Sequence, residues 1–535
     1  MTILPHFIPS DWFHFSFFLI LYAETHYRFK YLFSYLKKNE PEIIADIPSR
    51  VTLGAQIPVL LILKDADKFP VLIKELSIFE KKRLICSQKI NTKVNANYKD
   101  ISFFINSNNL SPGQHQFDIK ISYIINNKNK NCYADNYRGT SHDSLPIYIS
   151  RDQLPSFENC IFGDTHTHTN YTSDQVEFGA SLEATRLMSR AMGLDFFCAT
   201  DHSYDLDDQE NNYLKNDPDL KKWKDFKKTV KNLNSNPGDV IIIPGEEVSV
   251  RNSEDKNVHL LIYNSDRFFP GAGDSGEKWF RNLSDFSISE VINELNNSSL
   301  ALSAHPSEIP PFLQRLLIKR GFWKYQDCIQ NGLNGLQFIN GGGNSSIERS
   351  KNFWTKLLLQ GNRLTGIAGN DAHGNFSRFR QIGFPFITMK EHYLHLFGKW
   401  RTGIYLKNNK RDLKTTLNAL KSGNCFMTNG PALLLEVYTA NDRYSMGEIC
   451  TEPVKCKIKV RSTAEFGSLN SIKIILGDLD KKQEIIYYKI SHEKNIFDFH
   501  QEIVMNNLPE QGYLRMEATT VNQCQAFSNP IWFDN

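Results

Sequence analysis

The sequence predicts an α/β protein whose central part is a barrel of seven strands with intervening helices, flanked by two β-sandwich-like domains. Two observations lead to this prediction. Apolar runs of strand length alternate with segments of helical spacing through the middle of the chain, whereas short β-like runs follow one another on either side of it. The length of 535 residues also exceeds what one hydrophobic core supports. We therefore expect four segments, at residues 1–39, 40–157, 158–425 and 426–535.

The first segment contains an apolar and aromatic stretch at residues 13–23. This stretch is shorter than the roughly 20 residues that a helix needs to span a bilayer. The first ten residues contain no Lys or Arg, which argues against a secretory signal peptide. We expect an aromatic helix that packs on its own protein. The alternative is an interfacial helix at a membrane surface, helped by Arg28, Lys30 and Lys37.

The two flanking segments have the pattern of β domains. Short runs of β-forming residues, several of them alternating, are separated there by clusters of Asn, Asp, Gly and Pro. In the N-terminal domain the runs lie at residues 51–53, 59–63, 71–79, 101–105 and 117–125. In the C-terminal domain they lie at residues 433–438, 454–460, 472–476, 485–490, 497–504 and 513–520. Such spacing predicts a β-sandwich.

The central segment alternates between strands and helices. The expected strands are residues 161–164, 195–200, 240–244, 258–263, 300–304, 335–339 and 364–368, and the expected helices are 182–192, 218–233, 288–295 and 347–359, with 413–421 after them. Strands separated by helices favour a parallel sheet or barrel. Seven strands in so short a span suit a barrel better than an open sheet.

Charge and cysteine usage limit the partners and the compartment. The formal net charge is only +3, and Lys and Arg are scattered among Asp and Glu, so no nucleic-acid partner is expected. The nine cysteines form no CxxC pair, which argues against a zinc ribbon or a disulfide framework. We expect a reducing, cytoplasmic compartment and a small-molecule substrate.

Polar residues with metal-binding side chains follow the predicted central strands. In a barrel, the C-terminal ends of the strands meet at one mouth, where active sites form. One residue, His259, begins its predicted strand instead of following it. It fits only if the chain makes a hairpin-like excursion before it or if the strand is offset. The candidates are His166, His168, Asp174, His202, Glu247, His259, His305, Asp371 and His373.

Imidazole and carboxylate groups are the ligands that zinc, manganese and iron take in proteins. In the HxH pair, His166 and His168 point to one face of an extended segment, because side chains alternate along a strand. Nine candidate ligands exceed what one ion needs, so two or three divalent ions are expected. A single strand histidine is more often a packed or capping residue, but the joint pattern argues against that interpretation here.

The pattern resembles the PHP (polymerase and histidinol phosphatase) superfamily of metal-dependent hydrolases. Five motifs of that superfamily occur in order: His166-Thr-His168, Thr200-Asp201-His202, Pro244-Gly245-Glu246-Glu247, His305-Pro306 and Asp371-Ala372-His373. The resemblance covers about residues 161–423 and implies a distorted seven-stranded (βα) barrel with up to three metal ions. The flanking β domains and the segments Thr428-Asn-Gly-Pro431 and Ser528-Asn-Pro530 are similar to the carbaryl-hydrolase-like branch.

The resemblance also implies three ligand sets. The first ion would be held by His166, His168, Glu247 and Asp371, the second by Glu247, His259 and His305, and the third by Asp174, His202 and His373. The fourth residue of the PGxE motif is the ligand, which selects Glu247 over its neighbour Glu246.

The expected function is hydrolysis of a small phosphate ester. A metal-bridging hydroxide oriented by Glu247 would attack phosphorus, and Asp201 would support a ligand or carry a proton. Arg378 and Arg380 would clamp the phosphate. One alternative is a metal-dependent hydrolase of a carboxylic ester, carbamate or amide. Another is a non-catalytic binding or scaffolding protein with a vestigial site.

Overall fold

In the computed structural model, the described residues are 40–534 apart from 138–139, 173–177, 211, 237–238, 274–282, 311, 379–380, 385–386, 391–394, 408 and 492–494. The predicted aromatic helix in residues 1–39 lies outside the described residues. Two predicted site residues, Asp174 and Arg380, also lie outside them.

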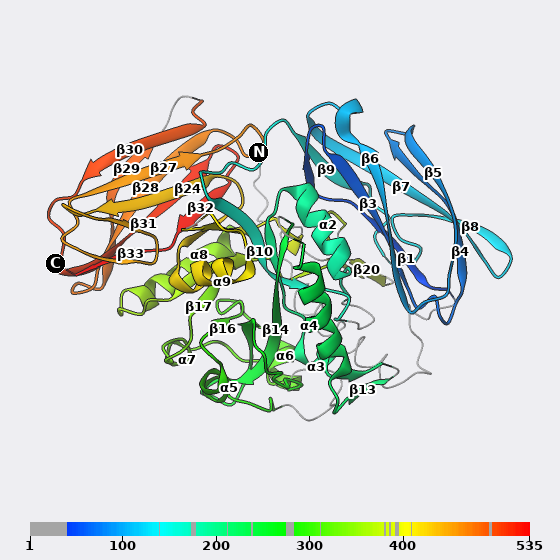
Figure 1. The fold of residues 1–535 in the computed structure, drawn as a ribbon, viewed down its shortest axis with the longest axis horizontal. Coiled ribbons are helices and arrows are strands. Elements are labelled where there is room, and N and C mark those ends of the chain that lie inside the picture. The colour runs from blue at the N-terminus through cyan, green and yellow to red at the C-terminus, as the bar shows by residue number, and fades with distance from the viewer. Residues whose placement is uncertain are drawn as a thin grey trace, which may run out of the picture.

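Three parts make up the molecule. Figure 1 shows the N-terminal β domain in blue and cyan on one side and the C-terminal β domain in orange and red on the other, with the central part between and below them. Strands account for 46% of the described residues and helices for 16%. The protein is therefore mostly β, and the predicted α/β class is wrong.

The N-terminal domain is built from two sheets. One has the strand order β1-β3-β6, and the other has the order β2-β9-β7-β4-β5 with β8 paired to β7. Along β7, alternate side chains such as Phe117, Ile119 and Ile121 are buried. Apolar side chains from both sheets form one core, as in a β-sandwich. The strands are β1 (Glu42–Asp46), β2 (Arg50–Thr52), β3 (Gln56–Lys64), β4 (Val71–Glu80), β5 (Arg83–Val94), β6 (Tyr98–Asn106), β7 (Gly113–Ile125), β8 (Lys128–Tyr133) and β9 (Leu145–Ser150), with a short 3-10 helix at Ser107–Asn109.

The central strands lie in the order β18-β17-β16-β15-β14-β11-β10. Most are buried along their whole length, which explains their continuous apolar sequence. They are β10 (Cys160–His168), β11 (Phe196–Ala199), β14 (Ile241–Arg251), β15 (Asn257–Tyr263), β16 (Leu300–Ser303), β17 (Gly335–Asn340), β18 (Thr365–Gly369) and β19 (Ala372–His373). Short peripheral strands are β12 (Asp208–Gln209), β13 (Asn212–Asn216), β20 (Gln381–Phe384) and β21 (Ile387–Lys390).

Helices cover the central strands, and their ends follow local sequence signals. Ser181 caps the first of them and Gly193 ends it in the left-handed conformation that glycine adopts without strain. In the same way, Asp412 caps the N-terminus of the helix at Leu413–Ser422, and Gly423 ends it in the left-handed conformation. The helices are α2 (Leu182–Met192), α3 (Ser203–Leu206), α4 (Lys221–Leu233), α5 (Ile288–Glu294), α6 (Phe312–Leu317), α7 (Tyr325–Cys328), α8 (Asn344–Leu358) and α9 (Leu413–Ser422).

The predicted seven-stranded (βα) barrel is wrong. The central strands belong to one mixed sheet of 16 strands, in which β15 pairs antiparallel with both of its neighbours. The physical reason is a tight turn between β14 and β15. The side chain of Asn252 accepts the backbone N–H groups of Glu254 and Lys256, so the chain reverses without an intervening helix. The sheet then continues from β10 through the antiparallel strands β22 (Arg401–Tyr405) and β23 (Cys425–Thr428).

The C-terminal domain extends this sheet and adds a second one. The strands β32, β31, β28 and β29 continue from β23, and a separate sheet has the order β25-β24-β27-β30. Apolar side chains from both sheets share a core. The strands are β24 (Ala432–Tyr438), β25 (Arg443–Ser445), β26 (Ile449–Thr451), β27 (Lys455–Arg461), β28 (Leu469–Asp478), β29 (Gln483–Ser491), β30 (Asp498–Val504), β31 (Gln511–Thr520), β32 (Gln525–Ser528) and β33 (Ile531–Asp534).

Polar contacts join the domains. The carboxamide of Asn529 accepts the N–H of Gly366 at 2.7 Å and donates to the carbonyls of Gly366 and Cys425, both at 2.9 Å. The guanidinium of Arg50 in the N-terminal domain forms an ion pair with Glu465 in the C-terminal domain at 3.0 Å. The Ser-Asn-Pro segment noted in the sequence therefore has a structural role, because its asparagine ties β18 and β23 to the C-terminal domain.

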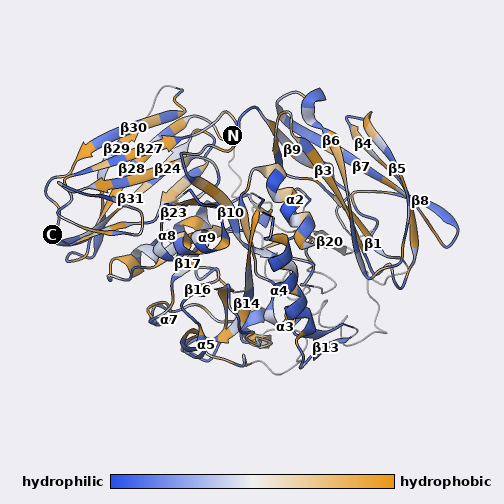
Figure 2. Ribbon diagram, in the orientation of Figure 1, coloured by the Kyte–Doolittle hydropathy of each residue, from blue (hydrophilic) through white to orange (hydrophobic). Residues whose placement is uncertain are grey.

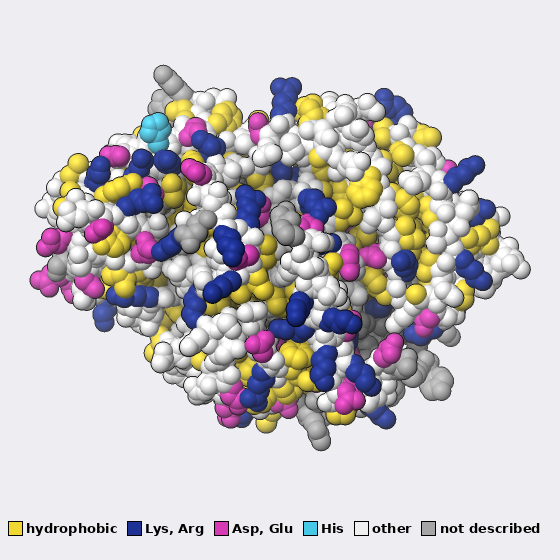
Figure 3. Space-filling view, in the orientation of Figure 1, with side chains coloured by type: hydrophobic (Ala, Val, Ile, Leu, Met, Phe, Trp, Pro, Cys, Tyr) yellow, Lys and Arg dark blue, Asp and Glu magenta, His cyan; other side chains and the backbone are white. Residues whose placement is uncertain are grey.

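The surface is mixed in charge, and apolar residues lie inside. In Figure 2, apolar and polar residues alternate along strands of both flanking domains. Lys and Arg are interspersed with Asp and Glu on the face shown in Figure 3. None of the helices in the described part of the chain combines the length and the apolar character that crossing a bilayer requires.

Candidate metal centre

Strand β10 carries the first part of the site. Asp164, His166 and His168 alternate along it and are all buried. Their side chains share one face because the strand period is two residues. The strand is paired with β11 along one edge and with β19 near its end, where Thr167 lies opposite Ala372 and His168 opposite His373. This pairing brings the His-x-His segment next to the Asp371–His373 segment, which is about 200 residues away in sequence.

Asp201 and His202 follow β11. The backbone of Asp201 bonds to β14 through the N–H of Glu247 at 3.0 Å. Its carboxylate accepts the N–H groups of Thr169 and Thr172 and the hydroxyl of Thr169, at 2.7–2.9 Å. Thr172 Oγ1 lies 3.3 Å from Nδ1 of His168. Asp201 thus holds the loop behind His168, which is a positioning role. Its proton-transfer role stays a prediction.

Strands β14 and β15 supply Glu247 and His259 from the two arms of a hairpin. Ser249 lies opposite His259 in the register, so Glu247 is the diagonal neighbour of His259 on the same face. His259 Nδ1 is 2.7 Å from Glu247 Oε1. The hairpin-like excursion that His259 needed is therefore present. The neighbouring Glu246 faces Ser203 and Lys227 instead, and burial raises its pKa to about 8.

His305 and Asp371 lie in loops just beyond β16 and β18. Both have backbone torsions in the left-handed region, with φ of 30° for His305 and 54° for Asp371. Such torsions are uncommon outside glycine and tend to occur at functional sites. Gly369 precedes Asp371, and a Cβ atom at that glycine would lie 2.6 Å from the backbone nitrogen of His166. Glycine is needed there because β18 passes so close to β10.

Glu247 is the centre of the cluster and is 1% exposed. Five imidazole nitrogens lie within 3.6 Å of its carboxylate oxygens: His259 Nδ1 at 2.7 Å, His202 Nδ1 at 3.0 Å, His305 Nε2 at 3.1 Å, His168 Nε2 at 3.5 Å and His166 Nε2 at 3.6 Å. The second carboxylate, Asp371, has its Oδ1 atom 3.0 Å from His168 Nε2 and 3.3 Å from His166 Nε2. The ring of His373 stacks on that of His168 with centroids 4.1 Å apart.

These donor atoms form three overlapping groups, in each of which all ligand atoms lie within 4.8 Å of one another. The first contains the four residues expected for the first ion. The second shares Glu247 and His259 with the expected second set, and His305 touches the same carboxylate. The third shares His202 and His373 with the expected third set. The groups are His166, His168, Glu247 and Asp371; then His202, Glu247 and His259; then His168, His202 and His373.

The spacing suits a metal ion. With metal–nitrogen distances of about 2.0–2.1 Å, two ligand atoms at the corners of a tetrahedron lie about 3.3–3.4 Å apart. The Nε2 atoms of His166 and His168 are 3.3 Å apart, and His166 Nε2 is 3.3 Å from Asp371 Oδ1. Two imidazole nitrogens can face each other at this distance only with a proton or a cation between them. The residues therefore fit a divalent ion.

The electrostatics of the cluster follow from burial and close opposite charges. Burial alone would lower the pKa of His166, but the carboxylates of Asp371 and Glu247 raise it to about 10. Burial and the nearby His202 lower the pKa of His168. Although burial works in the opposite direction, the surrounding histidines hold the pKa of Glu247 well below its usual range. The cluster therefore combines buried negative charge with imidazoles that compete for protons, as a cation site does.

Sequence reasoning missed several residues that support the cluster. The buried carboxylate of Asp164 accepts N–H groups from His166, Asn370 and Gly398, and so fixes β10 against the loop after β18. The alternation Asp164-x-His166-x-His168 was a usable signal for it. Gln337 lies 2.9 Å from His166 Nδ1, and no sequence pattern pointed to it.

The predicted phosphate clamp is not presented to the cluster. The backbone N–H of Arg378 bonds to Asp46, and its guanidinium pairs with the buried carboxylate of Asp135 at 3.4 Å. Both partners belong to the N-terminal domain, so Arg378 joins two domains instead of facing substrate. The physical reason is that the chain after His373 turns toward β1, a contact that sequence spacing does not reveal. Arg380 lies outside the described residues.

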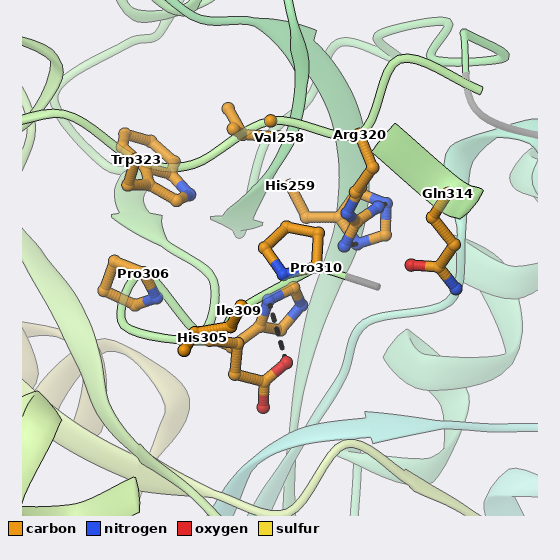
Figure 4. Close-up of a pocket in the computed structure, with 11 residues that line it drawn as sticks. Val258, His259, His305, Pro306, Ile309, Pro310, Gln314, Arg320 and Trp323 are labelled. Carbon is orange, nitrogen blue, oxygen red and sulfur yellow. Dashed lines mark hydrogen bonds and ion pairs between the residues drawn. The ribbon is translucent and has the colours of Figure 1, made fainter. Parts of the chain in front are cut away.

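A different arginine lies beside the cluster. A cavity of ≈ 80 Å³ opens next to His259 and His305, and the guanidinium of Arg320 borders it. Figure 4 shows Arg320 beside His259, with Gln314 extending from α6 near it. Arg320 Nη2 lies 3.0 Å from His259 Nδ1. Arg320 is held there because Asn257, which begins β15, bonds to the carbonyl of Lys319 and the N–H of Gly321.

Comparisons with known proteins add little. No family model and no curated protein matches the chain. Among solved structures, it is similar to a Parabacteroides merdae β-glucuronidase (10% identity, TM-score 0.18, 92% of this chain and 64% of that one). It is also similar to a calcium-binding mutant of Bacteroides uniformis β-glucuronidase 2 (10% identity, TM-score 0.19, 92% of this chain and 60% of that one). A third similar structure is a β-D-mannosidase from Dictyoglomus thermophilum (8% identity, TM-score 0.24, 91% of this chain and 66% of that one).

The chain thus spans about two thirds or less of the length of these glycosidases. At such low TM-scores the likeness carries no argument about fold or activity. The resemblance to the PHP superfamily stays a prediction from the sequence motifs, and the site must be judged on its own geometry.

Proposed function

We propose that this chain is a metal-dependent hydrolase that acts on a small phosphate ester. The observation that carries the proposal is the gathering of buried imidazoles around the carboxylate of Glu247, with Asp371 beside them. A buried charge of this kind is costly unless it is paired or coordinates a metal. Residues on or directly after six strands contribute to the cluster, and two of its members, His305 and Asp371, have strained backbones. Packing alone does not account for such an arrangement.

Two or three divalent ions, zinc, manganese or iron, would lower the pKa of a water molecule and stabilise charge on phosphoryl oxygens. The protein's part is to hold the donor atoms in place. Glu247 lies between the two sides of the cluster and would contact more than one ion. Asp371, with 24% of its side chain exposed, lies nearer to solvent and would face the substrate side.

Arg320 supports a phosphate ester over a carboxylic ester. Its guanidinium borders the cavity that adjoins His259 and His305. Arginine offers a planar fork of N–H groups that matches the oxygens of a phosphate and binds it in a bidentate manner. A carboxylic ester has no comparable charge. The cavity is small, at ≈ 80 Å³, so it suits a phosphoryl group or a compact substituent.

The first experiment tests the metal-hydrolase proposal. Purified protein is analysed for bound metal and then assayed with manganese or zinc on nitrophenyl esters of phosphoric and carboxylic acids. We expect at least two ions per chain and hydrolysis of phosphate esters. The double variant His166→Ala/His168→Ala should remain folded and lose turnover. Absence of bound metal together with absence of activity under all these conditions would reject the proposal.

A second experiment tests the role of Arg320. Arg320→Leu should lower kcat/KM for a phosphate ester about tenfold or more, because a charge-assisted bidentate contact is lost. The control is Arg315→Leu, since Arg315 lies five residues away and its guanidinium stacks on Phe312 and Phe322. Equal effects of the two substitutions would show that Arg320 does not recognise the phosphate.

We also propose that the protein works in a reducing compartment such as the cytoplasm. All nine cysteines are free thiols, and seven of them are buried. Mass spectrometry of alkylated protein from intact cells should find them reduced.

A further inference from the structure

Gln337, in the middle of β17, connects two parts of the metal centre that lie far apart in sequence. Its side chain is 1% exposed. Its Oε1 atom is 2.9 Å from Nδ1 of His166 and also accepts the backbone N–H of His305 at 3.1 Å. One carbonyl oxygen therefore contacts a histidine of β10 and a histidine of the loop after β16.

The hydrogen bonds continue from Gln337 to Glu308, whose carboxylate lies beside the ring of His305. Gln337 Nε2 donates to Asn340 Oδ1 at 2.8 Å, and Asn340 Nδ2 donates to Glu308 Oε1 at 2.6 Å. Glu308 Oε2 then lies 3.6 Å from His305 Nδ1, the contact drawn as a dashed line in Figure 4. The chain of contacts thus begins at one histidine ring and ends at another.

The direction of these bonds decides which ring nitrogen carries the proton. Gln337 Oε1 can only accept, so Nδ1 of His166 must donate, and its Nε2 lone pair faces His168 and Asp371. The Glu308 carboxylate lies 3.6 Å from Nδ1 of His305, and its negative charge favours a proton on that nitrogen. His305 Nε2 then faces Glu247 at 3.1 Å. Both rings are left with the nitrogen that points into the cluster available for a metal.

We propose that Gln337, Asn340 and Glu308 are positioning residues that fix His166 and His305 as Nε2 ligands of the metal centre. The inference rests on the proposed function, because it assumes that the cluster holds ions. It extends that function to three residues outside the ligand set. It also gives a reason for the strained backbone of His305, whose N–H group is held by the same Gln337 oxygen that holds His166. Partners of this kind, behind metal-ligating histidines, set ring orientation and metal affinity.

The test uses the full chain, labelled with ¹⁵N in its histidines and loaded with zinc. The wild type should show imidazole signals of the type protonated at Nδ1 and coordinated at Nε2 for His166 and His305. Gln337→Met, which removes both polar atoms at similar size, should lose the His166 signal. Glu308→Leu should lose the His305 signal. Each substitution should weaken zinc binding about 10- to 100-fold in competition with a chelator.

Two further variants make the outcome decisive. Gln337→Glu keeps an acceptor for His166 and should retain its signal, which covers the case in which Gln337→Met does not fold. Gln501→Met removes an amide that bonds to Tyr488 in the C-terminal domain and should leave zinc binding unchanged. Zinc affinities within twofold of the wild type in Gln337→Met and Glu308→Leu would overturn this inference alone. A wild type that binds no zinc would overturn the proposed function as well.

Discussion

Gly369→Ala tests whether the close approach of β18 to β10 builds the metal centre. A Cβ atom at position 369 would lie 2.6 Å from the nitrogen and 2.7 Å from the Cβ of His166, whereas ordinary contacts begin at 3.4 Å. To bring the 2.6 Å contact to an ordinary 3.4 Å, the two strands must move apart by about 0.8 Å. Both atoms belong to His166 itself, so the change reaches a predicted ligand directly.

The expected magnitude follows from this displacement. Overpacking of this kind costs about 1–3 kcal/mol of unfolding free energy. A ligand shift of about 0.8 Å exceeds the roughly 0.2 Å that a metal–ligand distance tolerates, so zinc affinity should fall at least about tenfold. Urea unfolding of the metal-free protein measures the first quantity, and chelator competition measures the second.

The matched control is Gly343→Ala, because a Cβ atom there would meet nothing within 4 Å and the residue has no positive φ. It should leave both quantities near their wild-type values. If Gly369→Ala bound zinc as tightly as the wild type and unfolded at the same urea concentration, the close approach of the two strands would not control the site.

Four further predictions concern the metal, its supports and the fold. A chelator should lower the unfolding temperature, because ligand at about 100 times its Kd stabilises the folded state by about 2.7 kcal/mol; an unchanged thermal transition would contradict a structural role for the ions. Asp201→Ala should weaken zinc binding about 10- to 100-fold through the loop behind His168, as seen by titration, and should also lower the unfolding free energy measured in urea by about 1–3 kcal/mol, because it leaves the buried N–H groups of Thr169 and Thr172 without an acceptor. Asn529→Ala should lower the unfolding free energy by about 3 kcal/mol, because it leaves buried backbone groups of β18 and β23 without partners. Asp412→Ala should cost about 1 kcal/mol at neutral pH by removing the cap of α9. The bond from Lys410 and the capping bonds from Thr415 lower the pKa of Asp412 to about 2, below its unfolded value, so this difference should be present above pH 4 and vanish as the pH falls through 2.

Local elements were largely predictable because their signals are local. The helix at Leu182–Met192 has the expected bounds, with Ser181 and Gly193 marking its ends. The expected helix at residues 218–233 begins three residues later, at Lys221, because Asp217 caps a turn whose N–H donors are Asp219 and Lys221. Strands of the flanking domains were found where apolar residues alternate, but β5 was missed because most of its residues are at least partly exposed.

The candidate site was predictable in its residue types and less so in its supports. Histidine and carboxylate side chains at strand ends indicate a metal site regardless of the order in which those strands pair. Gln337 behind His166 and Arg320 beside the cavity have no sequence pattern, because their roles come from contacts between segments far apart in the chain. Arg378 shows the converse, since its place in the sequence suggested a site that its contact with Asp135 excludes.

The sequence by itself determined many of the strand and helix positions, Glu247, and seven of the residues that the structure brings together around it. It did so because period, capping and ligand chemistry depend only on neighbouring residues. Only the tertiary structure decided the sheet topology. The turn at Asn252 reverses the chain where a barrel would have needed a helix, and β10 pairs on both edges with strands that sequence alone cannot order. Strand pairing depends on contacts between residues far apart in the chain, so no local sequence pattern specifies it.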